Sequence, residues 1–282
     1  MTNDLLLNIF VLRIIMELIK TIAVNAIAAT AATMDVPEIF GTFHLAYLVI
    51  GIPLSALVAY WLRNSSERAN KVILNSTGIL LLIAEAYKHL FYAIVLGEYK
   101  SRKWSIIPLQ LCSMPMYLCI IAALVKSKYI QKGIYTFLAS YNALGGLATI
   151  IYPKTVSHEY VALNIHSYTW HLTLIFIAFY LIFSKRAGYK REDFRNAVWF
   201  AVSLFSIALC LNVAFYTKSE GVMNLFFIGP APPPAPDAIS TIYEGFPWVV
   251  ISIGYFLIVT LGSYIIFNMY RRYLKRKTQN ER

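Results

Sequence analysis

The chain has 282 residues, of which 59% are hydrophobic and only 14% are charged, and its formal net charge is +11. In soluble domains about a quarter of all residues are charged. This composition therefore excludes a soluble globular protein and indicates an integral membrane protein. The positive charges lie in short clusters between apolar runs. This pattern is typical of membrane topology, and we therefore expect no nucleic-acid partner.

The range 1–37 predicts a separate N-terminal element. Its apolar run carries Arg13, Glu17 and Lys20, which fall near one face of a helix. The element is either an amphipathic helix at the membrane surface or an additional span. The chain begins M-T-N-D, without a basic region, so we expect no cleavable signal peptide.

Seven apolar segments follow in the range 38–270, each long enough to cross a bilayer. We expect an all-α fold, a polytopic transmembrane bundle of seven core helices plus the N-terminal amphipathic or additional transmembrane helix. The range 271–282 is expected to be a basic cytoplasmic tail. The seven segments are 43–62, 72–96, 105–125, 133–151, 160–184, 196–217 and 246–270.

The third segment contains the run I-P-L-Q-L-C-S-M-P, which an anchoring helix does not need. Pro108 and Pro115 each remove a backbone donor and clash with the preceding turn. Broken helices are tolerated in membranes where they line a cavity or are buried in protein. Gln110 and Cys112 lie in this irregular part. The alternative is a kinked packing helix with a small buried thiol.

Most Lys and Arg residues of the loops lie on the side of the C-terminus. The positive-inside rule therefore predicts a multi-pass cell-membrane protein with a cytoplasmic C-terminus and an extracellular Pro-rich loop, 218–245. With this orientation, polar side chains of several segments reach a similar depth near the outer side. They are His44, Glu85, His89, Gln110, Cys112, His166, His171 and Asn212, and Asn224 follows in the outer loop.

Ionisable residues at membrane depth are functional-site hypotheses by default. Glu85, Lys88 and His89 share one helical face, and they either neutralise one another or contribute to such a site. A thiol beside an imidazole forms a nucleophile and base pair. His166 and His171 are five residues apart and diverge by about 140° on a helix, so a single-helix metal chelate is not expected. We expect no metal, no cofactor and free cysteine thiols.

Five short motifs occur in order along the chain: F-G-T-F-H (40–44), I-P-L-Q-L-C-S-M-P-M-Y-L (107–118), W-H-L-T-L-I (170–175), G-V-M-N-L-F-F-I with the following proline loop (221–236), and G-F-P-W (245–248). Over about residues 38–270 they resemble the bacterial YwaF-like integral membrane proteins. That family is related to a eukaryotic transmembrane acyltransferase that remodels ether phospholipids, and distantly to the androgen-induced membrane hydrolases. The resemblance implies lipid acyl chemistry by a nucleophile and a histidine within the bundle.

Four positions match the motifs of this family: His44, Cys112, His171 and Asn224. Two positions depart from them. Gln110 stands where the family has a histidine, and Leu109 stands where the eukaryotic relatives have a cysteine.

The function expected from these patterns is that of an acyltransferase or lipid esterase at an outer-leaflet site. Cys112 would be the nucleophile and His171 the general base. Oxyanion donors or orienting groups would come from Gln110, His44 or Asn224, while Glu85, His89 and His166 would support the site. The partners would be membrane lipids and a lipid or small-molecule substrate. A carrier or binding protein for a small solute or lipid is the alternative, and a structural membrane subunit is a further one. The sequence predicts no oligomeric state.

Overall fold

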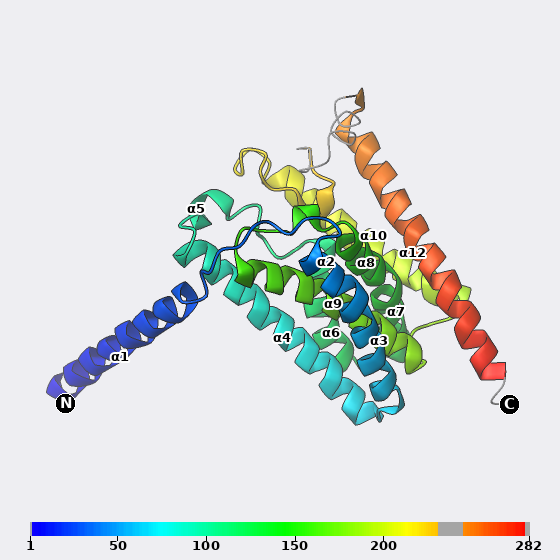
Figure 1. Ribbon diagram of the computed structural model, residues 1–282, viewed down its shortest axis with the longest axis horizontal. Helices are drawn as coiled ribbons and strands as arrows, with labels where there is room; N and C mark the ends of the chain where they lie inside the picture. The colour runs from blue at the N-terminus through cyan, green and yellow to red at the C-terminus, as the bar shows by residue number, and fades with distance from the viewer. Residues whose placement is uncertain (1, 231–244, 280–282) are drawn as a thin grey trace.

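The computed structural model describes residues 2–230 and 245–279, and within these ranges all regular elements are helical (Figure 1). Six of its helices are long and apolar enough to cross a membrane. A seventh apolar helix is shorter. The predicted all-α polytopic bundle is therefore confirmed. The six long helices are Thr42–Asn64, Glu67–Ile94, Lys128–Ile151, Val161–Phe183, Arg191–Ala214 and Trp248–Lys277, and the short helix is Leu111–Leu124.

Two of the long helices contain a π-helical turn. The first consists of α2 (Thr42–Ala46), a π turn (Tyr47–Gly51), α3 (Ile52–Trp61) and a 3-10 turn (Leu62–Asn64). The other consists of α7 (Lys128–Phe137), a π turn (Leu138–Asn142) and α8 (Ala143–Ile151).

The remaining helices are single elements. They are α1 (Thr2–Ala28), α4 (Glu67–Ile94), α5 (Tyr99–Arg102), α6 (Met114–Leu124) after a 3-10 turn (Leu111–Ser113), α9 (Val161–Phe183), α10 (Arg191–Ala214) and α12 (Trp248–Gln279). Short 3-10 turns also cover Pro153–Thr155 and Leu225–Phe227. Helix α12 continues through position 271, where the sequence predicted the beginning of a tail.

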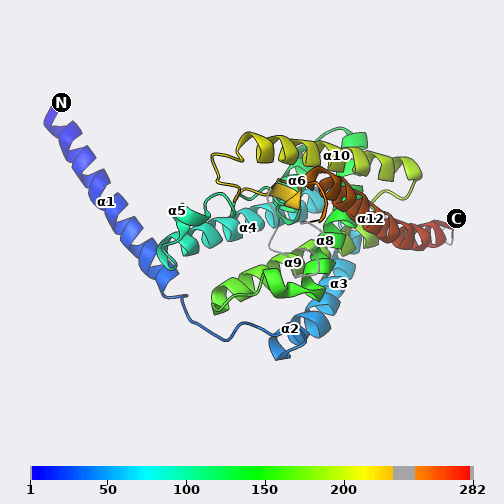
Figure 2. The same ribbon diagram turned by 90° about the horizontal axis from the view of Figure 1, so that it is seen from above.

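Helix α1 extends away from the bundle (Figures 1 and 2). The segment that follows it crosses one end of the bundle and is held there by hydrogen bonds. The Thr30 and Tyr87 hydroxyls lie 2.7 Å apart, and the Val161 N–H donates to the Ala32 carbonyl at 2.9 Å. That α1 is either a helix at the membrane surface or an additional span stays a prediction.

The helices of the bundle pack in pairs, with α4 on α6, α3 and α8 on α9, and α10 on α7. The packing of α4 on α6 depends on Gly78. A Cβ atom at this position would lie 2.8 Å from the Met116 carbonyl oxygen, which is closer than real Cβ contacts. Small residues of this kind allow the backbones of membrane helices to approach closely.

The third apolar segment is interrupted around Pro108, as this proline predicted. Its helix begins at Leu111 rather than at Ser105, so this element is shorter than the sequence indicated. Pro115 lies in the first turn, where its missing N–H costs nothing. The carbonyls before the helix find side-chain donors: Tyr117 Oη donates to Pro108 O at 3.1 Å. This satisfies the requirement that backbone groups at membrane depth have partners.

Candidate functional site

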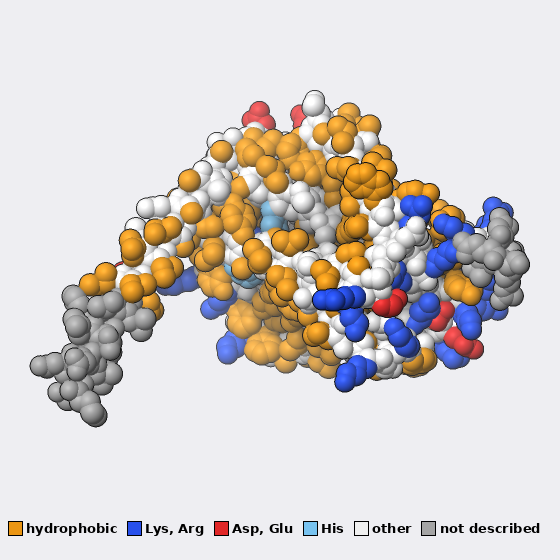
Figure 3. All heavy atoms as spheres, turned by 90° about the horizontal axis from the view of Figure 1, so that it is seen from below, with side chains coloured by type: hydrophobic (Ala, Val, Ile, Leu, Met, Phe, Trp, Pro, Cys, Tyr) orange, Lys and Arg blue, Asp and Glu red, His pale blue; other side chains and the backbone are white. Residues whose placement is uncertain are grey.

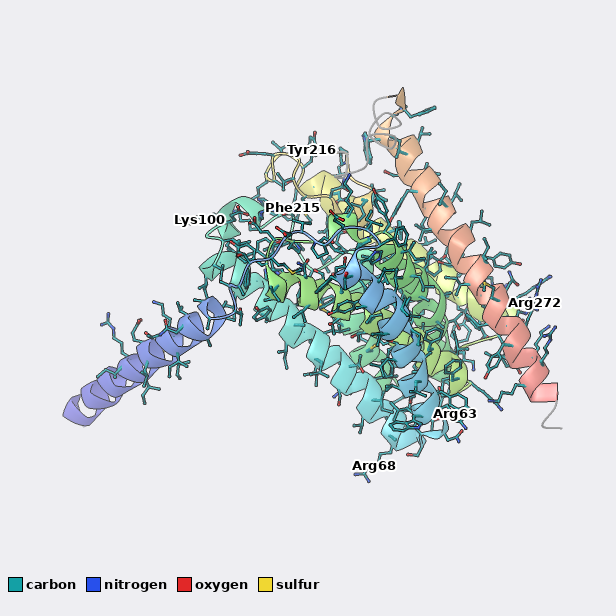
Figure 4. All side chains as sticks on the ribbon, in the orientation of Figure 1. Arg63, Arg68, Lys100, Phe215, Tyr216 and Arg272 are labelled. Carbon is teal, nitrogen blue, oxygen red and sulfur yellow. The ribbon has the colours of Figure 1, made fainter. Side chains whose placement is uncertain are left out.

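A cavity of about 310 Å³ lies between α4, the turn before α6 and α9, under the loops at one end of the bundle. Lys100, Phe215 and Tyr216 mark this end in Figure 4. Six of the eight predicted site residues line the cavity, although they come from four separate parts of the chain. They are Glu85, Gln110, Cys112, His166, His171 and Asn224.

Cys112 lies in the 3-10 turn that precedes α6 and is half-buried. Its carbonyl oxygen accepts a hydrogen bond from Trp170 Nε1 at 3.0 Å. Trp170 belongs to α9 and also lines the cavity. The indole therefore fixes the backbone of the cysteine against the helix that carries the histidines.

His171 is 5% exposed and lies on α9. Its Nδ1 atom is 2.7 Å from the Ser167 carbonyl oxygen. A carbonyl oxygen only accepts, so Nδ1 carries the proton and Nε2 is the acceptor in the neutral ring. In the described part of the chain, no hydrogen bond joins the Cys112 thiol to this ring.

His166 also lines the cavity and has the opposite tautomer. Its Nε2 is 3.0 Å from the Ala84 carbonyl oxygen, so Nε2 is the donor. Its Nδ1 is buried and has no hydrogen-bond partner. Buried polar atoms are nearly always paired, so this nitrogen is an acceptor available to a ligand.

Glu85 is 5% exposed and forms an ion-pair network on α4. Its Oε1 lies 2.7 Å from Lys88 Nζ and 3.2 Å from His89 Nε2. Lys88 therefore neutralises the carboxylate and offsets the cost of burying it, while a contribution of these residues to a functional site stays a prediction. Glu85 and Lys88 both line the cavity, whereas His89 does not.

Gln110 and Asn224 hold the segment 224–229 at the edge of the cavity. Gln110 Oε1 accepts from the Phe226 N–H at 2.6 Å, and its Nε2 donates to the Asn224 carbonyl at 3.0 Å. Asn224 Oδ1 accepts from the Gly229 N–H at 2.7 Å. Gln110 therefore positions a loop with both ends of its amide.

His44 lies outside the cavity, and it is fully buried. Its Nδ1 accepts from the Phe40 N–H at 2.8 Å, and its Nε2 donates to the Ile150 carbonyl at 2.7 Å. Both ring nitrogens are thus occupied by backbone groups. This histidine ties the beginning of α2 to the end of α8.

Three charged or titratable residues of the cavity were not among the predicted site residues, namely Lys88, Tyr92 and His158. His158 lies in the loop before α9, where Asn164 holds its backbone through two hydrogen bonds of 2.7 Å. Burial lowers its pKa, and the positive charges of Arg102 and Lys88 lower it further. The sequence could have indicated His158 through its position in a short loop, which the predicted topology places on the same side as the predicted site.

The site therefore combines a thiol, three imidazoles and an ion pair around one small cavity. In the described ranges, no three His, Cys, Asp or Glu side chains are grouped so that they could hold a metal ion. Cys112, Cys119 and Cys210 are free thiols.

The model of the TMEM164 family, a family of transmembrane proteins, matches residues 39–267. This range covers the bundle and all eight predicted site residues. No curated protein and no solved structure was found to match the chain. The resemblance to the YwaF-like proteins stays a prediction.

Proposed function

The chain belongs to the TMEM164 family of transmembrane proteins, and from this premise we propose that it acts on the acyl chains of membrane lipids. It is an acyltransferase or a lipid esterase whose nucleophile is Cys112 and whose general base is His171. The observation that carries the proposal is that both residues line one cavity of about 310 Å³ within the bundle. The resemblance of the motifs to acyl-transferring membrane proteins supports the same reaction.

In the proposed reaction, Cys112 Sγ attacks the carbonyl carbon of a lipid ester while its proton passes to His171 Nε2. Nε2 is the nitrogen that the Ser167 contact leaves as the acceptor. The ester C–O bond breaks, and the leaving alcohol takes the proton back from His171. The acyl thioester is then cleaved by water, or by an acceptor alcohol, which restores the thiol.

Because the thiol and the imidazole make no hydrogen bond to each other without substrate, the cavity has to tighten when substrate enters. Catalytic hydrogen bonds are often long before the substrate binds. The Lys88 ammonium lines the cavity, and because Glu85 occupies only one of its three N–H groups, a second N–H would donate to the oxyanion of the tetrahedral intermediate.

A second hollow provides room for the acyl chain. It has a volume of about 710 Å³, lies between α4 and α9, and is lined mainly by apolar side chains such as Leu80, Leu81 and Phe176. His166 and Trp170 line both this hollow and the cavity. A chain held in the larger hollow would therefore bring its ester group to the cavity.

The test uses the purified full-length protein in phosphatidylcholine nanodiscs whose acyl chains carry an alkyne tag. Wild-type protein should become labelled through a hydroxylamine-sensitive thioester, and mass spectrometry should detect free fatty acid or an acylated lysophospholipid. Cys112→Ala should abolish the label, and His171→Gln should slow it by about 100-fold or more, which is the usual contribution of a general base. Cys119→Ala is the matched control because Cys119 is a buried thiol of α6 that does not line the cavity.

Full labelling and turnover of Cys112→Ala would show that this thiol is not the nucleophile. The second candidate function is a carrier, and the observation that favours it is the break before α6 beside the cavity. Transporter sites are often built at such broken helices. A carrier would move a solute or lipid across liposomes without forming a thioester.

A further inference from the structure

A second polar hollow lies at the end of the bundle opposite the candidate site. It has a volume of about 910 Å³ and is formed where α4, α7 and α10 begin and where α3 and α9 end. Arg63, which lines it, lies at the lower end of the bundle in Figure 4, far from Lys100. We call this hollow the basic cleft.

Cations outnumber acids in the basic cleft by six to three. The six cations are Arg63, Lys128, Lys132, Lys185, Arg186 and Lys190, and the three acids are Glu67, Glu192 and Asp193. Figure 3 looks at the molecule from this end and shows several Lys and Arg side chains on this face, with a few acids between them.

Two of the acids are already engaged by the protein. Asp193 Oδ2 accepts from the Lys190 N–H at 2.9 Å, which caps the beginning of α10. Glu67 lies 3.7 Å from Lys128 Nζ and 3.4 Å from Arg186 Nη2. One carboxylate is thus shared between two cations, and the cleft keeps an excess of positive charge.

Two of the cations are held inward instead of extending into solvent. The Arg186 side chain is only 12% exposed, and its Nη2 donates to the Ser65 carbonyl at 2.7 Å. Its Nε is buried without a partner. Lys132 is half-buried, and no carboxylate among the described residues lies within 4.0 Å of its ammonium. Buried charges are costly unless they are paired.

Membrane topology explains why Lys and Arg are frequent at this end, but it requires neither their convergence nor their burial. We propose that the basic cleft binds a phosphate ester, carried either by a phospholipid head group or by a soluble molecule. A phosphate monoester brings about two negative charges and three strong acceptor oxygens, which match the excess of cations. Arg186 presents a planar fork of donors that suits phosphate oxygens. The inference does not depend on the acyl chemistry proposed above.

The experiment compares two probes that carry the same phosphate group, with the full-length protein in phosphatidylcholine nanodiscs. Phosphatidic acid is added to the nanodiscs and counted by native mass spectrometry, and radiolabelled glycerol 3-phosphate is added to the buffer and measured by equilibrium dialysis. We expect saturable binding of at least one probe. Phosphatidic acid alone would identify a lipid head group, and binding of both would identify the phosphate itself.

Two double variants distinguish a built site from general attraction. Lys132→Gln with Lys190→Gln should weaken binding by about tenfold or more, because each removes a charge-assisted contact. Arg272→Gln with Lys275→Gln removes the same charge from exposed positions of α12 outside the cleft, and should change binding by less than about twofold.

A second cleft variant combines Lys128→Gln with Lys190→Gln and changes only exposed side chains. It replaces the first variant in the test if the loss of Lys132 impairs folding. It should also weaken binding, while the thermal unfolding midpoint stays that of the wild type. Equal weakening by the cleft pairs and the α12 pair would overturn the proposal. The absence of saturable binding for both probes would overturn it as well.

Discussion

The imidazoles of the candidate site have their tautomers set by backbone carbonyls. His171 Nδ1 and His166 Nε2 lie 2.7 and 3.0 Å from carbonyl oxygens of Ser167 and Ala84. The two rings therefore offer opposite nitrogens as acceptors, Nε2 from His171 and Nδ1 from His166. One cavity thus has two acceptor nitrogens of different kinds, Nε2 of His171 and Nδ1 of His166.

A pH dependence follows from His158. Burial, and then the charges of Arg102 and Lys88, lower its pKa in the folded protein below the ordinary 6.5. The unfolded chain therefore binds a proton at a higher pH than the folded chain. The contribution of His158 to the free energy of unfolding is therefore at its maximum above about pH 6.5. It is lost as the pH drops through this value towards the pKa of His158 in the folded protein.

The variant His158→Gln should lose less stability than the wild type when the pH is lowered from about 7.5 to about 5, since its side chain does not titrate. The measurement is the thermal unfolding midpoint in detergent at both pH values. The difference between the two proteins isolates His158 from the other histidines, which both retain. An identical pH dependence of wild type and variant would contradict the prediction.

Among the elements, the segment 219–229 is held in place by side-chain hydrogen bonds. Phe226 and Phe227 have φ values of 56° and 57°. Residues other than glycine adopt such positive φ values rarely and at a cost in conformational energy. Asn212 holds this segment through the Leu225 N–H at 2.7 Å and the Leu225 carbonyl at 2.9 Å. Gln110 holds it from the other side.

Gln110→Ala should release this segment. The buried Phe226 N–H loses its acceptor, and the Asn224 carbonyl loses one donor but keeps the Phe227 N–H at 3.4 Å, so the free energy of unfolding should fall by about 1–3 kcal/mol. Hydrogen exchange of the amides at 225–229 should accelerate by about tenfold or more. Gln110→Glu should have an intermediate effect, because it keeps the acceptor for Phe226 but loses the donor for Asn224. Unchanged exchange in Gln110→Ala would show that Asn212 alone is sufficient.

The sequence allowed the helices to be predicted well, because apolar length and proline positions depend on local chemistry. Pro108 indicated the break before α6, although the helix begins six residues later than expected. Depth in the membrane also placed six side chains at one cavity. Depth does not determine which way a helix faces, however. His44 therefore fell outside the cavity, since it bonds to Ile150 over 106 positions of sequence.

At the scale of the whole molecule, the two ends of the bundle differ in chemistry. One end has the candidate site, whose cations are few, and the other has the basic cleft with its six cations. Arg68 lies at the basic end and Lys100 at the end of the candidate site (Figure 4). The positive-inside rule predicts that the basic end lies in the cytoplasm and that the candidate site lies towards the outer leaflet.

Cysteine labelling tests this orientation in a chain whose three native cysteines have been replaced by alanine. Both Arg68 and Lys100 are exposed, so a single cysteine at either position is accessible to reagents on its own side. In intact cells, a membrane-impermeant maleimide should label Lys100→Cys and leave Arg68→Cys unlabelled, and a permeant maleimide should label both. The reverse pattern would place the basic cleft outside. The candidate site would then face the cytoplasmic leaflet, and the substrate of the proposed reaction would be expected there.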